Sequence, residues 1–314
     1  MKTVFIVNPC AGKGNKDALL QSFDAIGDDS KNVYITKGVG DATLFVREYI
    51  KNHGPARFIA CGGDGTFSEV LGGAIESEGS EIGVFPCGTG NDFCRNFASD
   101  CLFESILNQM NGEVIKCDAI KYTTETEDGI KEGYCANMFN IGFDANVADL
   151  TGQMKKKTFI SGSFAYLISI FVTLIRKKGA DLTVETDGEI SHNGKLLLAS
   201  IANGSFCGGG IMSNPLASVT DGIMDINIIK NISRLRFLHL FPYYKKGTHM
   251  DVKNIEKVIT VKKCREIVII PRGGKMRLCI DGEIIDAGKT KFEICPGAFN
   301  FVLPKVPKTD YVKI

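Results

Sequence analysis

One carboxylate, Asp64, lies between two glycines in the segment ACGGDGTFSEV (residues 60–70). A carboxylate beside a bound phosphate is repelled unless a cation lies between them. Magnesium commonly bridges nucleotide phosphates to one or two protein carboxylates, so this segment suggests a magnesium–nucleotide site. Thr66 and Glu69 also match the T-x-x-E capping box of a helix N-terminus. A capping role for these two residues is compatible with ligand binding. The sequence pattern suggests no comparable structural role for Asp64.

Four polar, glycine-containing segments follow successive predicted strands. In open α/β sheets, ligands bind at the carboxyl edge of the strands, and free N–H groups at helix N-termini suit phosphate. One such turn would be an ordinary strand-to-helix connection, but four in succession favour phosphate binding. None has the spacing of a P-loop or of a G-x-G-x-x-G fingerprint. The segments are NPCAGKG (Asn8–Gly14), TKGVGDAT (Thr36–Thr43), GGDGT (Gly62–Thr66) and CGTGND (Cys87–Asp92).

The elements that position these turns alternate between strand and helix through the first third of the chain. Such alternation predicts a parallel sheet with helical crossover connections. The expected strands are Thr3–Val7, Asn32–Thr36, Arg57–Cys61 and Ile82–Pro86. The expected helices are Lys16–Ile26, Gly40–Asn52 and Thr66–Ile75, with a further helix starting near Asp92.

Beyond about residue 114 the pattern changes to short runs rich in Val, Ile, Thr and Phe between turn residues. This is typical of an antiparallel β-sandwich or barrel-like domain, interrupted by helices at Phe159–Lys178 and Leu235–Lys245. The predicted fold class is therefore α/β plus β: an N-terminal parallel α/β domain with a C-terminal antiparallel β-sandwich. The predicted boundaries are residues 1–122, residues 123–298 and a final strand in residues 299–314 that is free to return to the first domain.

The formal net charge of +1 argues against a nucleic-acid partner, because no overall field favours one. The 11 cysteines include no C-x-x-C pair, which indicates reduced thiols in a cytoplasmic compartment and no zinc site. The most apolar stretch, Phe159–Ile175, has 17 residues and includes several Ser, Thr and Gly. Spanning helices need about 20 mostly apolar residues, so a buried or interfacial helix is expected there.

Several segments in order along the chain resemble the diacylglycerol kinase catalytic-domain family, and especially soluble bacterial lipid kinases. PCGTGNDFCRNF (Pro86–Phe97) is similar to the lipid-kinase pattern P-x-G-T-x-N-D-F-A-R, with Cys94 in place of alanine. The sequence GGDGT is less specific, because NAD kinases and phosphofructokinases have a similar one. Further matches are Phe139–Ala148, Ala202–Ile226 and Asp281–Glu283.

The resemblance implies an N-terminal phosphofructokinase- or NAD-kinase-like domain that binds ATP and a C-terminal domain that receives the lipid. By motif match, the implied ATP contacts are Asn8, Pro9, Cys10, Ala11, Gly12, Thr36, Gly63, Asp64, Gly65, Thr66, Phe67, Ser68, Glu69 and Thr89. SVTDGIM resembles a structural magnesium loop, in which the ligands would be the Asp221 carboxylate and the carbonyls of Ser218 and Ile223. Without the resemblance, TDG is simply a tight turn.

The resemblance assigns Glu283 as the proton acceptor for the lipid hydroxyl. Related sphingosine kinases instead implicate the aspartate of the G-D-G turn, which is Asp64 here, and the sequence leaves both possibilities open. We place Glu283 first as base and Asp64 first as organiser of Mg²⁺–ATP. Asp281-Gly282 also has a structural interpretation, because Asp-Gly between two strands predicts a hairpin.

A lipid substrate must be fetched from a bilayer, and basic clusters accompany both long helices of the second part. Lys155–Lys157 and Arg176–Lys178 flank Phe159–Ile175, and Arg234–His249 interleaves basic and aromatic residues. Such segments can bind anionic membrane surfaces, although a buried helix with solvated ends is an equal alternative. The resemblance thus implies peripheral contact with the inner face of the cell membrane, and a homodimer.

The acceptor is the main question that the sequence leaves open. Diacylglycerol, which would give phosphatidic acid, is the first expectation, and sphingoid bases, undecaprenol and monoacylglycerol carry the same hydroxyl on a long chain. An NAD kinase-like enzyme and a nucleotide-binding regulator without kinase activity are the alternative functions. GTGNDF argues against the former, and the presence of Asp64, Asn91, Asp92, Asp221 and Glu283 argues against the latter.

Overall fold

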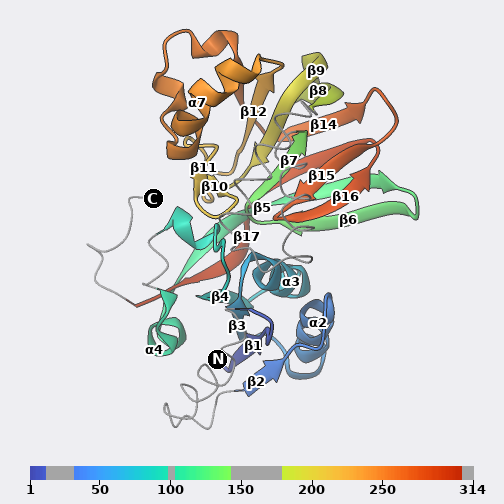
Figure 1. Ribbon diagram of the computed structural model, residues 1–314. Helices are drawn as coiled ribbons and strands as arrows, with labels where there is room; N and C mark the ends of the chain where they lie inside the picture. The colour runs from blue at the N-terminus through green and yellow to red at the C-terminus, as the bar shows by residue number, and fades with distance from the viewer. Residues whose placement is uncertain (12–31, 98–102, 143–178, 306–314) are drawn as a thin grey trace. The chain divides into compact units, whose positions relative to one another are not determined.

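A computed structural model (Figure 1) describes residues 1–11, 32–97, 103–142 and 179–305 of the chain. The chain divides into two compact units. The N-terminal unit comprises Met1–Ala119 and Pro296–Ile314, and the β unit comprises Ile120–Cys295. Strands β5 (Glu113–Thr126) and β17 (Thr290–Leu303) each belong partly to one unit and partly to the other.

Some predicted features lie outside the described residues. These are the helices at Lys16–Ile26 and Phe159–Lys178, the basic clusters Lys155–Lys157 and Arg176–Lys178, and Gly12. Among the helices that are described, none is both long and apolar enough to cross a bilayer.

A parallel sheet forms the centre of the N-terminal unit. Its strand order is β2-β1-β3-β4-β17, and the end of β17 joins through Asn300 and Phe301, parallel to β4. All five residues of β1 are buried, as expected for a continuous apolar run in the middle of a parallel sheet. Besides β17, the strands of this sheet are β1 (Thr3–Val7), β2 (Asn32–Ile35), β3 (Arg57–Gly62) and β4 (Glu81–Pro86).

Helices α2 (Asp41–His53) and α3 (Asp64–Ala74) pack against each other beside this sheet (Figure 1). A short helix α4 (Ile106–Met110) follows later. The helix expected near Asp92 is instead a pair of turns and the single 3₁₀ turn η2 (Cys94–Asn96). Asn91, which precedes these turns, has a left-handed φ of 52°.

The β unit is antiparallel throughout its described strand pairs. Strands β16, β15, β7, β9, β8, β14 and β17 are neighbours in that order, β12 pairs with β9 and β13, and β5 pairs with β6. The predicted fold class is therefore confirmed. The strands are β6 (Gly129–Cys135), β7 (Met138–Gly142), β8 (Ala180–Thr186), β9 (Glu189–Ala202), β10 (Phe206–Cys207), β11 (Ile211–Met212), β12 (Met224–Lys230), β13 (Ile259–Cys264), β14 (Glu266–Pro271), β15 (Met276–Ile280) and β16 (Glu283–Ala287).

Two apolar clusters hold the β unit together. The larger one fills the space between its strands and includes Phe139 and Phe292, whose ring centroids are 4.8 Å apart. The second lies under helix α7 (Arg234–Lys246) and the 3₁₀ turns η4 (His249–Asp251) and η5 (Ile255–Lys257). The helix expected at Leu235–Lys245 is thus confirmed.

Candidate functional site

The four predicted glycine turns meet at the carboxyl edge of the parallel sheet in the N-terminal unit. Backbone hydrogen bonds join them at the strand ends: Asn8 N donates to Cys61 O over 3.0 Å, and Cys87 N donates to Gly62 O over 2.8 Å. Thr36 N donates to Val7 O over 2.9 Å. The turns are therefore neighbours in space because their parallel strands are neighbours, and their backbone N–H groups gather at one edge.

Two of these turns touch backbone to backbone. A Cβ on Gly88 would lie 2.5 Å from Gly63 Cα, and a Cβ on Gly63 would lie 3.2 Å from Gly88 Cα. Asn91 holds the second turn, because its Oδ1 accepts from Gly88 N over 3.0 Å and its Nδ2 donates to Gly88 O over 3.1 Å. Glycine is thus required at these positions by close approach, which a sequence pattern alone could not distinguish from a need for flexibility.

Asp64 is the first residue of α3 and links its turn to the next one. Its Oδ1 accepts from Asp92 N over 2.7 Å and from Phe93 N over 3.4 Å. A carboxylate at a helix N-terminus is also favoured by the helix dipole. The expectation that Asp64 has no structural role is therefore wrong, because it holds the GTGND turn in place.

The second oxygen of Asp64 faces a space that it shares with Asp92. A Cβ on Gly90 would lie 2.5 Å from Asp64 Oδ2 and 3.4 Å from Asp92 Oδ2. Asp92 is only 7% exposed, and Arg95 Nε lies 3.9 Å from Asp92 Oδ1. Two carboxylates that converge on one small space repel each other unless a cation joins them. Asp64 and Asp92 therefore suit the oxygen coordination that magnesium prefers.

Asp92 is a candidate that the sequence reasoning did not place in the site. It lies inside the GTGNDF motif, so the signal was present, but nothing in the spacing indicated that its carboxylate meets that of Asp64 from 28 positions earlier. The convergence depends on the register of β3 and β4, which brings Gly62 opposite Pro86.

The predicted capping box at Thr66 and Glu69 is wrong. The helix begins two residues before Thr66, at Asp64, with Gly63 as its N-cap, so Thr66 already lies within the first turn. Its Oγ1 accepts from Asn8 Nδ2 over 3.1 Å. Glu69 reaches a different helix, where its carboxylate accepts from Gly40 N over 2.9 Å and from Ala42 N over 3.2 Å.

Thr66 and Glu69 therefore fasten two other turns to α3. Thr66 holds the turn after β1, and Glu69 holds the TKGVGDAT turn. Both side chains can organise a nucleotide site without touching the nucleotide.

The other predicted ATP-contact residues differ in what they can offer a ligand. Phe67 is 2% exposed and stacks on Phe93 with ring centroids 4.6 Å apart, so its side chain belongs to the core. Thr36 is also buried. Gly65, Cys10 and Thr89 are exposed, whereas Pro9, Ala11 and Ser68 are half-buried.

In the β unit, Asp281 and Glu283 have separate roles in one hairpin. Asp281 and Gly282 have φ of 44° and 97°, which confirms the predicted Asp-Gly turn between β15 and β16. Asp281 Oδ1 accepts from Met138 N over 2.9 Å, and its Oδ2 accepts from Cys135 Sγ over 3.2 Å. Glu283 is exposed at the start of β16. Asp281 thus fixes the hairpin, and Glu283 is accessible from solvent.

Tyr122 lies beside this acidic hairpin and is 6% exposed. Burial first, then electrostatic interactions with Cys135 and with the carboxylates of Glu283 and Asp281, raise the pKa of Tyr122 to about 12. Its phenol therefore remains protonated at neutral pH and can only accept or donate hydrogen bonds near Glu283.

The predicted magnesium loop already contains a cationic side chain. Asp221 Oδ2 is 2.9 Å from Lys263 Nζ, and Asp221 Oδ1 accepts from Ile223 N over 3.3 Å. Across the ranges that the structure describes, no group of three or more His, Cys, Asp or Glu side chains is arranged to hold a metal ion. Lys263 therefore already pairs with Asp221, which is the one side chain in the expected magnesium site of Ser218, Asp221 and Ile223.

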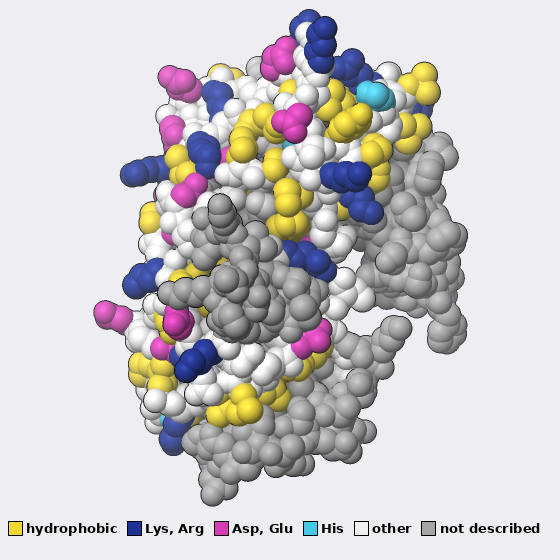
Figure 2. Space-filling model, turned by 90° about the vertical axis from the view of Figure 1, so that its left-hand side faces the viewer, with side chains coloured by type: hydrophobic (Ala, Val, Ile, Leu, Met, Phe, Trp, Pro, Cys, Tyr) yellow, Lys and Arg dark blue, Asp and Glu magenta, His cyan; other side chains and the backbone are white. Residues whose placement is uncertain are grey.

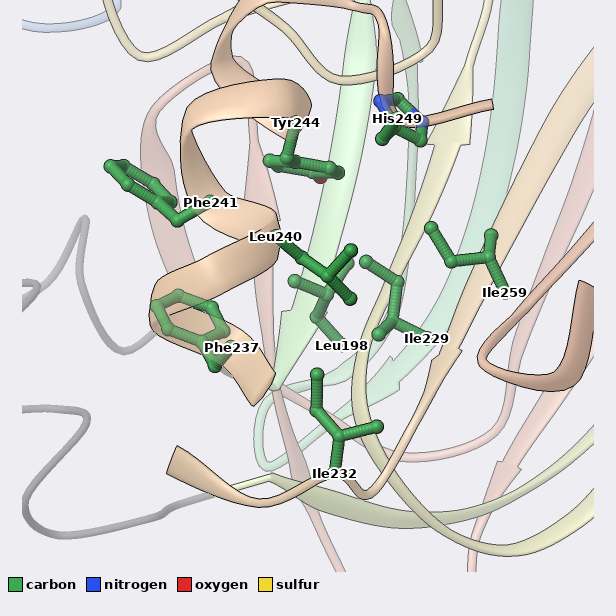
Figure 3. Close-up of a pocket in the computed structure, with 9 residues that line it drawn as sticks. All are labelled: Leu198, Ile229, Ile232, Phe237, Leu240, Phe241, Tyr244, His249 and Ile259. Carbon is green, nitrogen blue, oxygen red and sulfur yellow. The ribbon is translucent and has the colours of Figure 1, made fainter. Parts of the chain in front are cut away.

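An apolar pocket lies under α7 in the β unit (Figure 3). Phe237, Leu240 and Tyr244 of α7 face Leu198, Ile229 and Ile259 of the strands, and His249 closes one end. Its volume of about 20 Å³ has room for one water molecule. An acyl chain therefore cannot enter unless α7 moves.

His249 is fully buried, and neither ring nitrogen has a well-formed hydrogen bond within the described chain. Burial lowers the pKa of His249, and the nearby Tyr243 backbone offsets this only partly. The folded state thus favours the neutral ring. The unfolded chain binds the proton more readily, so stability is retained above the unfolded pKa of about 6.5 and is lost as pH falls from there towards the folded pKa.

We expect the wild-type protein to lose stability between about pH 7 and pH 5.5 more steeply than a His249→Phe variant, by at most about 1.4 kcal/mol per pH unit. Phenylalanine keeps a ring in the pocket and cannot be protonated. Denaturant titrations of both proteins at each pH measure the difference. Parallel pH profiles would show that protonation of His249 does not contribute.

A parallel α/β unit with glycine turns at its carboxyl edge, followed by an antiparallel β unit, is the arrangement of the NAD-kinase-like fold class. The chain matches two family profiles. The "Diacylglycerol kinase catalytic domain" covers residues 2–122, and the "YegS C-terminal NAD kinase beta sandwich-like domain" covers residues 137–303. The protein therefore belongs to the family of diacylglycerol kinase-like and YegS-like lipid kinases.

Two relatives illustrate the extent of the similarity. The chain is 30% identical to a diacylglycerol kinase of Staphylococcus aureus (strain MRSA252) over 287 residues, which covers 88% of this chain and 84% of the relative. It is 28% identical to a diacylglycerol kinase of Mycobacterium tuberculosis over 201 residues, or 62% of this chain. That match spans only 61% of the mycobacterial protein.

Solved structures share the fold. A diacylglycerol kinase from Bacillus anthracis str. Sterne aligns with a TM-score of 0.68 and 20% identity, covering 97% of both chains. Yeast NADH kinase, solved in complex with NADH, aligns with a TM-score of 0.53 and 10% identity, covering 99% of this chain and 85% of that one.

Proposed function

We propose that this protein transfers the γ-phosphate of ATP to the hydroxyl of a lipid, with diacylglycerol as the first expectation and phosphatidic acid as its product. The observation that carries the proposal is the convergence of Asp64 and Asp92 at Gly90, beside glycine turns, in a chain that belongs to a lipid-kinase family. Carboxylates that converge beside glycine turns and the N-terminus of a helix suit a nucleoside triphosphate with its metal ion.

In the proposed reaction the lipid hydroxyl oxygen bonds to the γ-phosphorus as the bond to the ADP oxygen breaks, and the hydroxyl proton passes to a carboxylate. Glu283 is the proposed acceptor, and Asp64 is the alternative. Mg²⁺ held by Asp64 and Asp92 would neutralise charge on the phosphates. Positioning and electrostatics carry most of the catalysis in such transfers, which fits a site built mainly from backbone turns.

The proposed ATP contacts are the backbone of the turn Asn8–Gly12, the α3 turn from Gly63 to Glu69, and Thr36 and Thr89. The structure supports two different roles for the residues of this set. Exposed Gly65 and Thr89 are suited to direct contact, whereas Thr66 and Glu69 hold neighbouring turns.

Transfer of labelled phosphate from ATP to a panel of lipids in mixed micelles tests this function. The panel contains diacylglycerol, monoacylglycerol, a sphingoid base and undecaprenol, with NAD as a soluble control acceptor. Label in one lipid identifies the acceptor. Label in NAD alone would support an NAD kinase, and ATP binding without transfer to any acceptor would support a regulator.

We also propose that α7 contacts the membrane from which the lipid is taken. Its outer face exposes Leu235 (81%), Leu238 (43%) and Tyr243 (41%). Arg234, Arg236, Lys245 and Lys246 are exposed on the same helix. In Figure 2 hydrophobic side chains lie among Lys and Arg in the upper part of the displayed face, where α7 lies. Apolar side chains surrounded by basic ones suit an anionic membrane surface.

We expect the double variant Leu235→Glu/Leu238→Glu to bind anionic vesicles at least about tenfold more weakly, because burying one leucine contributes about 1.5–3 kcal/mol. Co-sedimentation with vesicles that contain phosphatidylglycerol measures this. Ile190→Glu is the matched control, since Ile190 is 65% exposed on β9 of the same unit. Equal binding by the double variant and the control would exclude α7 as the docking element.

This membrane contact would place the enzyme at the inner face of the cell membrane, in the cytoplasm. A homodimer is a further proposal that rests on the family resemblance, and sedimentation equilibrium would test it.

A further inference from the structure

The loop between β11 and β12 of the β unit closes around the end of one lysine. Lys263 lies on β13, directly opposite Asp225 of β12. Its Nζ donates to Asp221 Oδ2 over 2.9 Å, to Asp225 Oδ2 over 3.0 Å and to the Leu216 carbonyl over 3.2 Å. An ammonium group has three protons to donate, and all three of these contacts are to oxygens of the loop or of the strand that follows it.

The charges of this cluster require a cation. The Asp225 side chain is 2% exposed, and a buried carboxylate is strongly unfavourable unless a positive charge compensates it. Asp221 adds a second carboxylate, and its Oδ1 accepts from Ile223 N, which closes the turn. Lys263 supplies a single positive charge at the point where both carboxylates meet.

A metal ion and Lys263 would compete for the Asp221 carboxylate, which is the one side chain of the implied magnesium site. Magnesium binds oxygens at about 2.0–2.1 Å in a nearly octahedral shell. Both oxygens of Asp221 are already engaged, Oδ2 with Lys263 Nζ and Oδ1 with Ile223 N, and the charge of the ammonium group would repel a divalent ion. The loop has oxygen atoms of the kind that magnesium prefers, but the ammonium group of Lys263 is already hydrogen-bonded to two of its carboxylates.

We propose that the Lys263 ammonium is the built-in cation of the Leu216–Asp225 loop and engages Asp221, the carboxylate that the family resemblance gives to magnesium, so that this loop keeps its structure without a metal ion. Removal of the ammonium would leave two carboxylates and a carbonyl around one space. We therefore expect the stability of the variant to depend on a divalent cation that binds these oxygens. The inference concerns the β unit alone and does not depend on which acceptor the enzyme uses.

Thermal unfolding of the full chain, without nucleotide, tests the proposal. Wild type, Lys263→Met and the matched control Lys230→Met are each measured with excess EDTA, with Mg²⁺ and with Ca²⁺. Lys230 is exposed on β12. We expect wild type and Lys230→Met to respond to the three conditions in the same way, with no part of any response to Mg²⁺ or Ca²⁺ removed by Asp221→Asn. In EDTA the Lys263→Met midpoint should fall by about 5–10 °C, and Mg²⁺ or Ca²⁺ should restore a large part of that loss.

Two results would overturn the proposal. One is an unchanged midpoint for Lys263→Met in EDTA, which would mean that the loop needs no cation from this lysine. The other is a saturable rise of the wild-type midpoint with Mg²⁺ that Asp221→Asn removes, which would mean that the loop binds metal while Lys263 is present. The wild-type and Asp221→Asn comparison decides the question even if Lys263→Met fails to fold, and an unchanged wild-type midpoint in it supports the proposal.

Discussion

Asp64→Asn is expected to lower kcat by about 10²–10³-fold, as the loss of one preorganised electrostatic group does in other active sites, while the N-terminal unit stays folded. The asparagine Oδ1 can still accept from the N–H groups of Asp92 and Phe93. What it removes is the negative charge beside Gly90, where the two carboxylates converge. Steady-state kinetics with Mg²⁺ varied at fixed ATP measures the effect, and the apparent requirement for Mg²⁺ should rise together with the loss of kcat.

Asp118→Asn provides the matched control for Asp64→Asn. Asp118 is also a buried carboxylate of the N-terminal unit that accepts a backbone N–H, from Gly297 over 2.7 Å, but it belongs to β5 and not to one of the four glycine turns. We expect near-normal kcat for Asp118→Asn. If the two variants had equal kcat and equal Mg²⁺ dependence, Asp64 would be only a structural residue of the GTGND turn.

The sequence predicted the strands of the N-terminal unit and the positions of its turns well, for local physical reasons. A continuous apolar run such as Thr3–Val7 can be stable only when buried, and all of it is. Glycines end these runs, so the polar turns fall at the strand ends. Because parallel strands share their carboxyl edge, the turns predicted from one-dimensional spacing meet in three dimensions.

The partners of individual side chains could not be predicted in this way. Thr66 and Glu69 have capping-box spacing, yet Glu69 binds the start of α2, 27 and 29 residues earlier in the chain. The choice depends on where α3 begins and on how it packs against α2, which are tertiary properties. Propensity rules describe local hydrogen bonds, and the start of a nearby helix can offer better-placed N–H donors.

The same limit applies to the loop at Asp221. Its local sequence predicts both a turn and a metal site, and the turn is confirmed by the bond from Ile223 N to Asp221. The competing cation comes from Lys263, 42 residues later, through pairing of β12 with β13. No spacing rule within the motif could include that lysine. A match to the motif therefore identifies the expected metal ligands in this chain, but not the distant residue that we propose in place of the ion.

Glu283→Gln is expected to lower kcat by about 10²–10⁴-fold, the usual contribution of a general base, without loss of ATP binding or of stability. Glu283 is exposed at the start of β16, so an isosteric amide should leave the hairpin intact. Asp281→Asn is the informative neighbour, because Asp281 accepts from Met138 N and Cys135 Sγ. Its loss should reduce the free energy of unfolding by about 1–3 kcal/mol.

The two hairpin variants, measured by single-turnover transfer and by denaturation, separate chemistry from folding. If Glu283 is the base, Glu283→Gln should slow the chemical step in a stable protein, whereas Asp281→Asn should lower stability more than it slows the chemical step.

Wild-type turnover in Glu283→Gln would remove Glu283 from the reaction. The proton would then pass to Asp64, the other candidate, and the kcat loss in Asp64→Asn would have to include both the base and the metal-binding contribution. In that case added Mg²⁺ should not restore turnover, so the Mg²⁺ dependence of Asp64→Asn decides between the two carboxylates.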